Sequence, residues 1–148
     1  MKRIVPHEDL CMGCTLCQVH CTLAHSRTKD LVKAYRRETP KILPRIKPAI
    51  DKPLSIGIQC HHCSHPPCVA ACLTGAMSLD PELGKVVHDI EKCIACWTCV
   101  MVCPFGALTV SDEQKTPLKC DFCPDLEVPA CVANCPNEAL TLEEVADQ

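Results

Sequence analysis

Aromatic residues are scarce in this sequence, which has one Trp, one Tyr and two Phe among 148 residues. Aromatic side chains normally supply much of the apolar area that a domain core buries. A chain of this size with so few of them needs covalent or metal cross-links to stabilise its fold. The composition therefore excludes a core that relies on side-chain packing alone.

Long apolar runs are missing as well. No segment approaches the roughly 20 apolar residues of a membrane-spanning helix, so we expect no membrane span. The N-terminus reads MKRIVPHEDLC and lacks the apolar stretch of a secretory signal. We therefore expect a cytoplasmic protein, in a reducing compartment where disulfides are rare.

What the sequence does have is cysteine, at sixteen positions. The stretch from Cys93 to Pro104 reads CIACWTCVMVCP, which is the C-x2-C-x2-C-x3-C-P spacing of bacterial iron–sulfur ferredoxins. Two-residue loops let three thiolates close around three corners of one cluster. The fourth cysteine, Cys103, lies about one helical turn further on, and in two-cluster ferredoxins the cysteine at this place ligates the other cluster.

This motif recurs four times along the chain. The four copies are CMGCTLCQVHC from Cys11, CHHCSHPPCVAAC from Cys60, CIACWTCVMVC from Cys93 and CDFCPDLEVPACVANC from Cys120. They are called motifs one to four below. The gap between the second and third cysteines widens to four residues in motif two and to seven in motif four.

Zinc is the main alternative metal that these cysteines could bind. Structural zinc commonly takes two C-x2-C pairs separated by a long loop. A triplet of cysteines with a fourth one turn later would crowd three ligands onto one ion from a single short loop. We therefore favour [4Fe-4S] clusters and keep a zinc-structured interaction module as a second hypothesis, which the colour of the purified protein separates.

Four clusters would use all sixteen cysteines. No thiol would remain as a nucleophile, and full cysteine ligation leaves no open iron position for a substrate. The sequence also has no phosphate loop, dinucleotide fingerprint or acid–base constellation. These features predict an electron-transfer protein rather than an enzyme.

The order of the motifs indicates an α+β fold of two bacterial ferredoxin-like units. Motifs two and three are separated by one expected hairpin, and motifs one and four lie at the ends of the sequence. We expect an inner unit at 54–111, an outer unit formed by 1–25 and 112–148, and a basic, proline-containing insertion at 26–53. Short apolar strands are expected at KRIV, LSIGI, GAMSL, KVVHD, GALTV and EALTL.

The insertion carries nine Lys/Arg residues against three Asp/Glu residues and four prolines. We expect one short helix around 29–37, followed by an extended or irregular path. A solvated loop that balances the cluster charge and a docking arm for an enzyme subunit are both open interpretations. A nucleic-acid patch is disfavoured because no aromatic platform accompanies the positive charge.

Two ligation schemes are compatible with the repeat. In sequential ligation, motif one would pair with motif two and motif three with motif four, but the insertion would then interrupt a unit. Crossed ligation pairs motif two with three and motif one with four. Its four ligand sets are Cys11, Cys14, Cys17 and Cys135; Cys60, Cys63, Cys68 and Cys103; Cys93, Cys96, Cys99 and Cys72; and Cys120, Cys123, Cys131 and Cys21.

Four histidines near the cysteines, together with Trp97 inside motif three, invite other roles. Because each motif already has four cysteines, we expect the histidines to be neighbours of the clusters or surface groups rather than Rieske-type ligands. Trp97 is expected to pack over a cluster or to contact a partner. These histidines are His20, His61, His62 and His65.

The segments HCSHPPCVAACLTGAM, CIACWTCVMVCPFGAL and KCDFCPDLEVPACVANCPNEAL carry a family resemblance over nearly the whole sequence. The sequence resembles the four-cluster ferredoxin-type electron-transfer subunits of redox complexes. Relatives include the beta subunits of formate dehydrogenase, dimethyl sulfoxide reductase and polysulfide reductase, and ferredoxin-like subunits linked to hydrogenase, carbon monoxide dehydrogenase and aldehyde oxidoreductase. Thr22 and Leu73 depart from the family pattern, because proline often follows the fourth cysteine there.

The resemblance implies two ferredoxin folds, four [4Fe-4S] clusters in a wire and crossed ligation. It also implies two partners, which are a second redox protein and a catalytic oxidoreductase subunit. That subunit would be of the molybdenum/tungsten, carbon monoxide dehydrogenase or hydrogenase type. A freely diffusing polyferredoxin is the alternative, and copurification of a large partner distinguishes the two.

Overall fold

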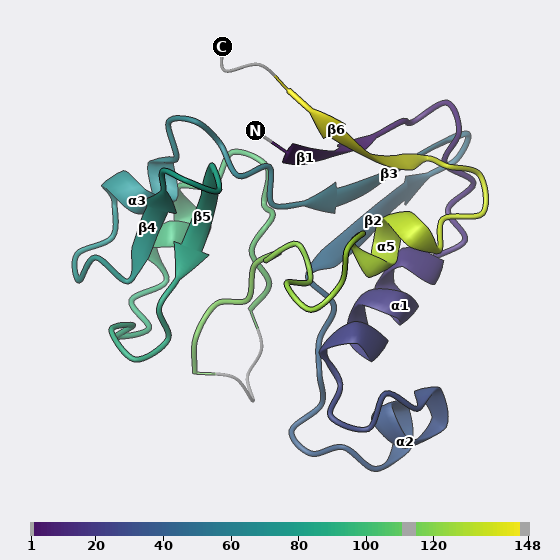
Figure 1. Ribbon diagram of the computed structural model, residues 1–148, viewed down its shortest axis with the longest axis horizontal. Coiled ribbons are helices and arrows are strands. Elements are labelled where there is room, and N and C mark those ends of the chain that lie inside the picture. The colour runs from purple at the N-terminus through teal and green to yellow at the C-terminus, as the bar shows by residue number, and fades with distance from the viewer. Residues whose placement is uncertain (1, 111–114, 146–148) are drawn as a thin grey trace.

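The computed structural model describes residues 2–110 and 115–145. The two ends of the described chain lie side by side, because β1 (Lys2–Pro6) pairs with β6 (Leu140–Glu144) in an antiparallel ribbon. Lys2 stands opposite Glu144, and Pro6 opposite Leu140. Both strands had been expected from their apolar residues, and Figure 1 shows them together beside N and C.

A second ribbon lies against the first. It is the hairpin of β2 (Ile46–Asp51) and β3 (Leu54–Gln59). The buried Gln59 amide donates to the Ile4 carbonyl oxygen at 2.9 Å and so ties β3 to β1. The ribbon therefore adds to the structure that the two chain ends form.

Strand β2 shows which form the expected extended or irregular path takes at 46–51, where the chain is extended and paired with β3. Pro48 lies inside β2, opposite Gly57 of β3. Proline has no N–H to donate, but each strand of a two-stranded ribbon has one free edge, where a missing donor costs nothing. A Cβ at Gly57 would lie 3.2 Å from the side chains of Ile46 and Leu140, so a larger residue here would require these side chains to shift.

The third ribbon has the expected hairpin form and joins β4 (Met77–Asp80) to β5 (Lys85–His88). At the turn, Asp80 Oδ1 accepts hydrogen bonds from the backbone N–H groups of Glu82 and Leu83 at 3.0 and 3.1 Å. Gly84 takes a left-handed φ of 58°. The hairpin leads directly into motif three, as the sequence indicated.

The strand expected at GALTV does not form. Among the described residues, this segment makes one isolated antiparallel bridge, between Thr109 and Leu118. Pro117 precedes Leu118 and has no N–H with which to extend a ladder. The apolar pattern correctly predicted that this segment is buried, since Leu108 is buried. A strand also needs a partner for its backbone hydrogen bonds, and burial does not provide one.

The described helices are short, and most of them carry cysteines. They are α1 (Leu16–His25), α2 (Leu31–Arg36), α3 (Pro67–Ala70), α4 (Thr98–Met101) and α5 (Ala130–Ala133). Helix α2 confirms the helix expected in the insertion, and its N-cap Asp30 accepts from the Lys33 N–H at 2.9 Å. Figure 1 shows α2 at the far end of α1, away from the strands. None of these helices is long and apolar enough to span a bilayer.

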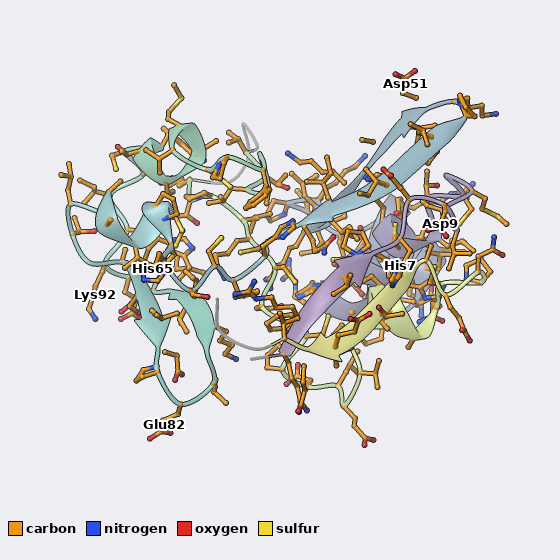
Figure 2. The ribbon with its side chains drawn as sticks, turned by 90° about the horizontal axis from the view of Figure 1, so that it is seen from above. His7, Asp9, Asp51, His65, Glu82 and Lys92 are labelled. Carbon is orange, nitrogen blue, oxygen red and sulfur yellow. The ribbon has the colours of Figure 1, made fainter. Side chains whose placement is uncertain are left out.

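Two buried clusters stabilise the structure, and both contain cysteine. They are Ile4, Cys21, Ile46, Cys120, Cys131 and Leu140 in one cluster, and Met77, Val86, Cys99 and Leu108 in the other. The first lies among β1, β2, β6, α1 and α5, the second beneath β4 and β5. Figure 2 shows Asp51 and Glu82 at the tips of the two hairpins, on opposite sides of the molecule.

The structure is therefore a small α+β fold of ribbons and short helices. The proposed division into inner and outer units stays a prediction, and its boundary at 111/112 lies outside the described residues. Hairpin β2–β3 draws one strand from the expected insertion and one from the expected inner unit.

Candidate metal centres

The third cysteine of every motif occupies the second position of a short helix. These residues are Cys17 in α1, Cys68 in α3, Cys99 in α4 and Cys131 in α5. The fourth cysteine always follows four residues later, which is about one helical turn. The same local structure thus recurs four times although the loop before the helix differs in length.

Helix α1 is longer than its three counterparts, and proline accounts for only part of the difference. Pro104 and Pro136 directly follow the fourth cysteine in motifs three and four, where helices α4 and α5 are four residues long. In motif one Thr22 takes this place and the helix continues to His25, whereas in motif two Leu73 takes it and α3 still ends at Ala70. The absence of proline therefore permits a longer helix but does not by itself produce one, and the cysteine spacing is intact in both motifs.

The loop before each helix bends through a left-handed residue. The second residue after the first cysteine always has a positive φ; these residues are Gly13 (69°), His62 (47°), Ala95 (57°) and Phe122 (65°). Alternation of left- and right-handed residues points successive backbone N–H groups into one concavity, an arrangement found around phosphates and iron–sulfur clusters. The loops are therefore shaped to surround an anionic group.

Three enclosed cavities are each lined by four cysteines. The linings contain Cys11, Cys14, Cys17 and Cys135 in the first; Cys60, Cys63, Cys68 and Cys103 in the second; and Cys72, Cys93, Cys96 and Cys99 in the third. In each cavity, three cysteines come from one motif and the fourth from its crossed partner. We name them the Cys11, Cys60 and Cys93 sets.

The remaining four cysteines gather between α1, α5 and the loop of motif four. Cys21, Cys120 and Cys131 belong to one buried cluster. Cys123 lies close enough to Cys21 and Cys131 to interact with both electrostatically. We name Cys21, Cys120, Cys123 and Cys131 the Cys120 set.

Burial raises the pKa of many of these thiols, and neighbouring cysteines raise it further. The pKa of Cys17 and of Cys68 rises to about 11, and that of Cys120 to about 12. Thiols packed this closely can all ionise only if a cation compensates their charge. Sets of four thiolates around one concavity suit soft metal centres such as iron–sulfur clusters, and the donor set therefore fits the [4Fe-4S] group.

Several cysteine sulfurs accept hydrogen bonds. The N–H of Arg45 donates to Cys21 Sγ at 3.2 Å, and that of Met77 to Cys72 Sγ at 3.3 Å. The Met77 hydrogen bond lowers the pKa of Cys72 because it stabilises the thiolate. Such contacts tune the electron density at a metal-bound sulfur.

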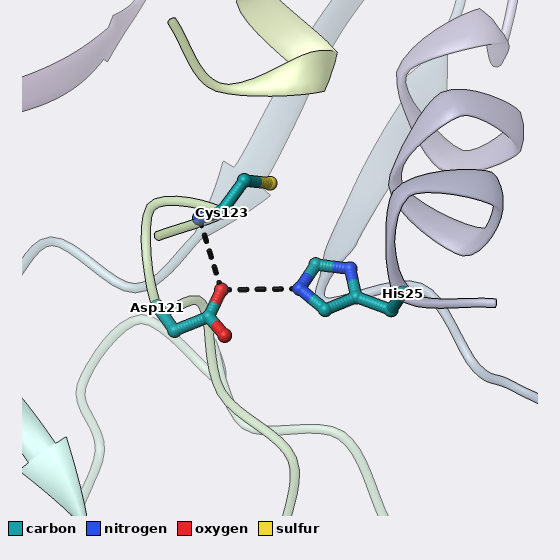
Figure 3. Close-up of side chains that lie close together, drawn as sticks. All are labelled: His25, Asp121 and Cys123. Atoms are coloured by element: carbon teal, nitrogen blue, oxygen red, sulfur yellow. Dashed lines mark hydrogen bonds and ion pairs between the residues drawn. The ribbon is translucent and has the colours of Figure 1, made fainter. Parts of the chain in front are cut away.

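An ion-pair network surrounds the Cys120 set. Figure 3 shows Asp121 Oδ1 between His25 Nε2 and the Cys123 N–H, each at 3.1 Å. Arg45 also contacts the Asp121 carboxylate, and His25 Nδ1 lies 2.8 Å from the Cys21 carbonyl oxygen. Asp121 therefore links motif one to the loop of motif four.

The network shifts the pKa values of its members. Burial alone would lower the pKa of His25, but the hydrogen bonds to Asp121 and Cys21 outweigh burial and raise it to about 9. Burial would raise the pKa of Asp121, yet His25 and Arg45 hold it well below its usual range. His25, Asp121 and Cys123 could by geometry hold a metal ion, but Cys123 belongs to the Cys120 set, so we interpret the group as an ion pair.

The structure places the expected histidines around the metal centres. His61 stacks on Phe105 with ring centroids 4.0 Å apart, and the fully buried His62 stacks on Phe122 at 4.1 Å. His20 is half-buried, and His65, labelled in Figure 2, is exposed. Of the four, His61 also lines the cavity of the Cys60 set.

Apolar side chains cover part of the space around the cysteines. Val69 and Val100 pack against the cluster beneath β4 and β5, and Trp97 lines the cavity of the Cys93 set. Ile94 also lines this cavity, although it is 63% exposed.

The polar residues Asp121, His25, Arg45 and Lys119 were missed by sequence reasoning. Each is a single charged or titratable residue without a recurring spacing. The only available signal was position, since Lys119 and Asp121 flank Cys120 directly. Charged residues beside a cysteine motif are too common on surfaces to identify a buried contact.

Comparison with known proteins assigns this sequence to a family. A family model described as 4Fe-4S dicluster domain matches residues 54–145. The B subunit of polysulfide reductase from Wolinella succinogenes is 34% identical over 97% of this chain and 76% of its own length. Electron transport protein HydN of Escherichia coli is 34% identical over 93% of this chain and 85% of its own.

Other matches give further context. An iron-sulfur protein of Rhodospirillum rubrum is 33% identical over 96% of this chain and 82% of its own length. In AegA of Escherichia coli, which is 33% identical, the chain spans only 21% of the protein. Among solved structures, the active site complex BamBC of benzoyl coenzyme A reductase shares the fold, with a TM-score of 0.54 at 23% identity over 97% of this chain and 76% of that one.

Proposed function

Because the protein belongs to the 4Fe-4S dicluster domain family, we propose that it is a non-catalytic electron-transfer subunit of an oxidoreductase complex with four [4Fe-4S] clusters. One observation carries the proposal: all sixteen cysteines fall into four sets of four. When bound, each cluster accepts and releases one electron. No cysteine is left over for another task.

We propose crossed ligation, with each set holding one cluster. The support is the composition of the three cavities, where Cys135 joins the cysteines of motif one, Cys103 those of motif two and Cys72 those of motif three. Sequential ligation would require Cys21 beside motif two. Instead, Cys21 packs with Cys120 and Cys131.

The four sets follow one another through the molecule. The buried cluster around Cys21 and Cys120 also touches Cys17 and Cys135 of the Cys11 set and Cys60 of the Cys60 set. The second buried cluster brings the Cys60 and Cys93 sets together. This supports a relay in the order Cys11 set, Cys120 set, Cys60 set and Cys93 set.

The relay also supports the two-unit organisation proposed from the sequence. The Cys60 and Cys93 sets belong to an inner unit, and the Cys11 and Cys120 sets to an outer unit formed by both chain ends. Contacts between Cys60 and the buried cluster around Cys120 lie where the units meet. The step between the Cys120 and Cys60 sets is therefore the one that crosses from unit to unit.

The ends of the relay are where we propose that partners dock. Cys14 and Cys96 are the two exposed cysteines, and they belong to the first and last sets. Exposed apolar side chains accompany them, Met12 beside Cys14 and Ile94 beside Cys96. We propose that one end receives a catalytic subunit, of the molybdenum/tungsten, carbon monoxide dehydrogenase or hydrogenase type, and the other a second redox partner in the cytoplasm.

Anaerobic iron and sulfide analysis tests the number of clusters. Four [4Fe-4S] clusters require roughly sixteen iron atoms and sixteen sulfides per chain. A brown protein with these contents supports the proposal, while a colourless zinc protein contradicts it. Anaerobic purification from the source organism then tests the subunit role, because a large redox partner should copurify, whereas a freely diffusing polyferredoxin would be isolated alone.

A further inference from the structure

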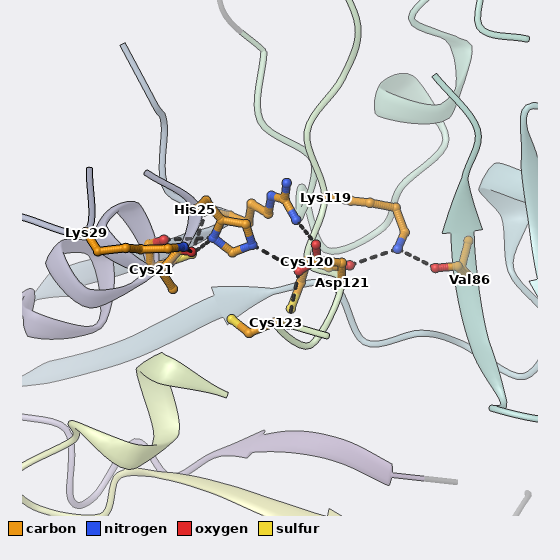
Figure 4. Close-up of polar contacts among 10 residues, drawn as sticks. Cys21, His25, Lys29, Val86, Lys119, Cys120, Asp121 and Cys123 are labelled. Atoms are coloured by element: carbon orange, nitrogen blue, oxygen red, sulfur yellow. Dashed lines mark hydrogen bonds and ion pairs between the residues drawn. The ribbon is translucent and has the colours of Figure 1, made fainter. Parts of the chain in front are cut away.

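Lys119 is a buried cation whose contacts are neutral. Lys119 is 6% exposed. Its Nζ donates hydrogen bonds to the carbonyl oxygens of Val86 and of Cys120, the latter at 2.8 Å. Figure 4 shows both contacts. Among the described residues, no carboxylate forms an ion pair with Lys119, because the neighbouring Asp121 is engaged by His25 and Arg45.

The positive charge of Lys119 must be offset by negative charge from another part of the protein. Removing an ammonium group from water has a large free-energy cost even after the protein relaxes, and two carbonyl dipoles offset only part of that cost. The negative charge that offsets this cation therefore comes from the thiolate sets on either side, because Cys60 and Cys68 line the same cavity as Lys119 and Cys120 follows it directly.

The position of Lys119 is specific to two of the four sets. It lines the cavity of the Cys60 set together with Cys60 and Cys68. It also directly precedes Cys120 and contacts the carbonyl of that residue. Lys119 does not line the cavities of the Cys11 and Cys93 sets.

We propose that Lys119 is a fixed positive charge that raises the reduction potentials of the two middle centres of the relay, those of the Cys120 and Cys60 sets. A nearby positive charge stabilises the reduced form of a cluster, because that form carries one more electron than the oxidised form. The effect raises the reduction potential and weakens with distance. Because Lys119 lies between the two middle sets, it acts on both sides of the step that joins the two units. This inference rests on the proposed four-cluster function.

A purely structural role for Lys119 would use the same contacts. Val86 is held at both of its backbone groups, since its carbonyl accepts from Lys119 and its N–H donates to His62 Nδ1 at 3.0 Å. These contacts fix the free edge of β5 to motifs two and four. The two roles differ in one respect: anchoring requires a donor, while setting a potential requires a charge.

The test compares variants of the full chain, reconstituted anaerobically with iron and sulfide. Lys119→Gln keeps a donor without charge, Lys119→Met removes both, and Lys119→Arg keeps the charge. Lys115→Gln is the matched control, because Lys115 is exposed in the same segment. The readout is an EPR-monitored redox titration that resolves the four one-electron steps, preceded by iron and sulfide analysis.

We expect two of the four midpoint potentials to move to more negative values in Lys119→Gln and Lys119→Met, and none in Lys119→Arg or Lys115→Gln. If the neutral variants do not load fully, selective loss of the Cys60 and Cys120 centres, with full loading of Lys119→Arg, gives the same support. Unchanged potentials, an equal shift of all four, or loss of all four centres would overturn the role of Lys119. A wild-type chain that does not bind four clusters would instead refute the proposed function.

Discussion

Cys103 shares a cavity with Cys60, although it belongs to the motif that begins at Cys93. The two cysteines are close enough for Cys103 to raise the pKa of Cys60, after the larger effect of burial. Cys72 is placed in the reciprocal way, in the cavity of the Cys93 set. Motifs two and three therefore each place their fourth cysteine in the cavity that the other motif lines, which supports the proposed crossed ligation.

Exchange of the fourth cysteines predicts opposite effects for two matched variants. Cys103→Ala should damage the centre of the Cys60 set, because it removes a ligand there, and should leave the Cys93 set loaded. Cys72→Ala should do the reverse. EPR spectra of the two reconstituted variants, with iron analysis, measure which signal is lost; loss of the Cys93 signal in Cys103→Ala would contradict crossed ligation.

Gly13 gives a second prediction, about the loop of motif one. Its φ is 69°, and a Cβ at this place would lie 3.0 Å from Ser55 Oγ and 3.4 Å from Ile50. Gly75 has nearly the same φ, 67°, with nothing within 4 Å of its Cβ position. A left-handed non-glycine residue costs about 1–2 kcal/mol at either site, so the difference between them isolates the contact with the β2–β3 hairpin.

We expect Gly13→Ala to destabilise the reconstituted protein more than Gly75→Ala, and to release iron from the Cys11 set first. The measurement is the rate of loss of visible cluster absorbance in guanidinium, followed for both variants and the wild type. Equal rates for the two alanine variants would mean that the hairpin yields to the added methyl group and does not constrain the loop.

Cysteine spacing predicted more of this structure than any other feature. The helical turn between the third and fourth cysteine follows from their short spacing, and the grouping of the first three cysteines of a motif follows from the loops that join them. Local sequence determines these features, whereas the fourth cysteine of each set comes from a distant motif.

Features that depend on distant partners were not predictable in the same way. GALTV has the same apolar pattern as GAMSL, yet only the latter finds a partner strand. Strand β2 was not predicted, because a proline such as Pro48 normally argues against a strand. The missing N–H of proline costs nothing, however, at the free edge of a ribbon. Asp121 and Lys119 are single charges whose roles arise from residues far away in the sequence, namely His25, Arg45 and Val86.

Asp121 gives a third prediction, about the link between motifs one and four. Asp121→Asn keeps an acceptor for the Cys123 N–H but removes the charge that pairs with His25 and Arg45. We expect the free energy of unfolding to fall by about 1 kcal/mol. This is the magnitude of an exposed ion pair rather than a buried one, because the Asp121 side chain is 36% exposed. The centre of the Cys120 set should be lost first when the variant is unfolded.

Asp89→Asn is the control for that variant, because the Asp89–Lys92 pair at 3.0 Å is a surface contact away from α1 and motif four. Cluster loss in guanidinium, followed by EPR, distinguishes the four centres. If Asp121→Asn and Asp89→Asn behave alike, the Asp121 network contributes nothing specific to the Cys120 set.

Removing the metal gives the fourth prediction, and it concerns the whole fold. Among the residues that the structure describes, the cluster around Cys21 and Cys120 contains three buried non-cysteine residues, Ile4, Ile46 and Leu140. Without a metal, the thiols in this cluster would be buried, weakly polar groups that no longer cross-link the protein. Metal binding in small domains of this kind supplies much of the folding free energy.

We therefore expect the protein to lose its ordered structure when a chelator and an oxidant remove the iron under conditions that keep the thiols reduced afterwards. Far-UV circular dichroism should fall to the level of an unfolded polypeptide, and amide hydrogen exchange in β1 and β6 should become fast. Anaerobic addition of iron and sulfide should restore both signals together, because the ribbon and the thiol sets share one core. Retention of protected amides in β1 and β6 after complete iron loss would show instead that the apolar residues of this core suffice to fold the ribbon without a metal.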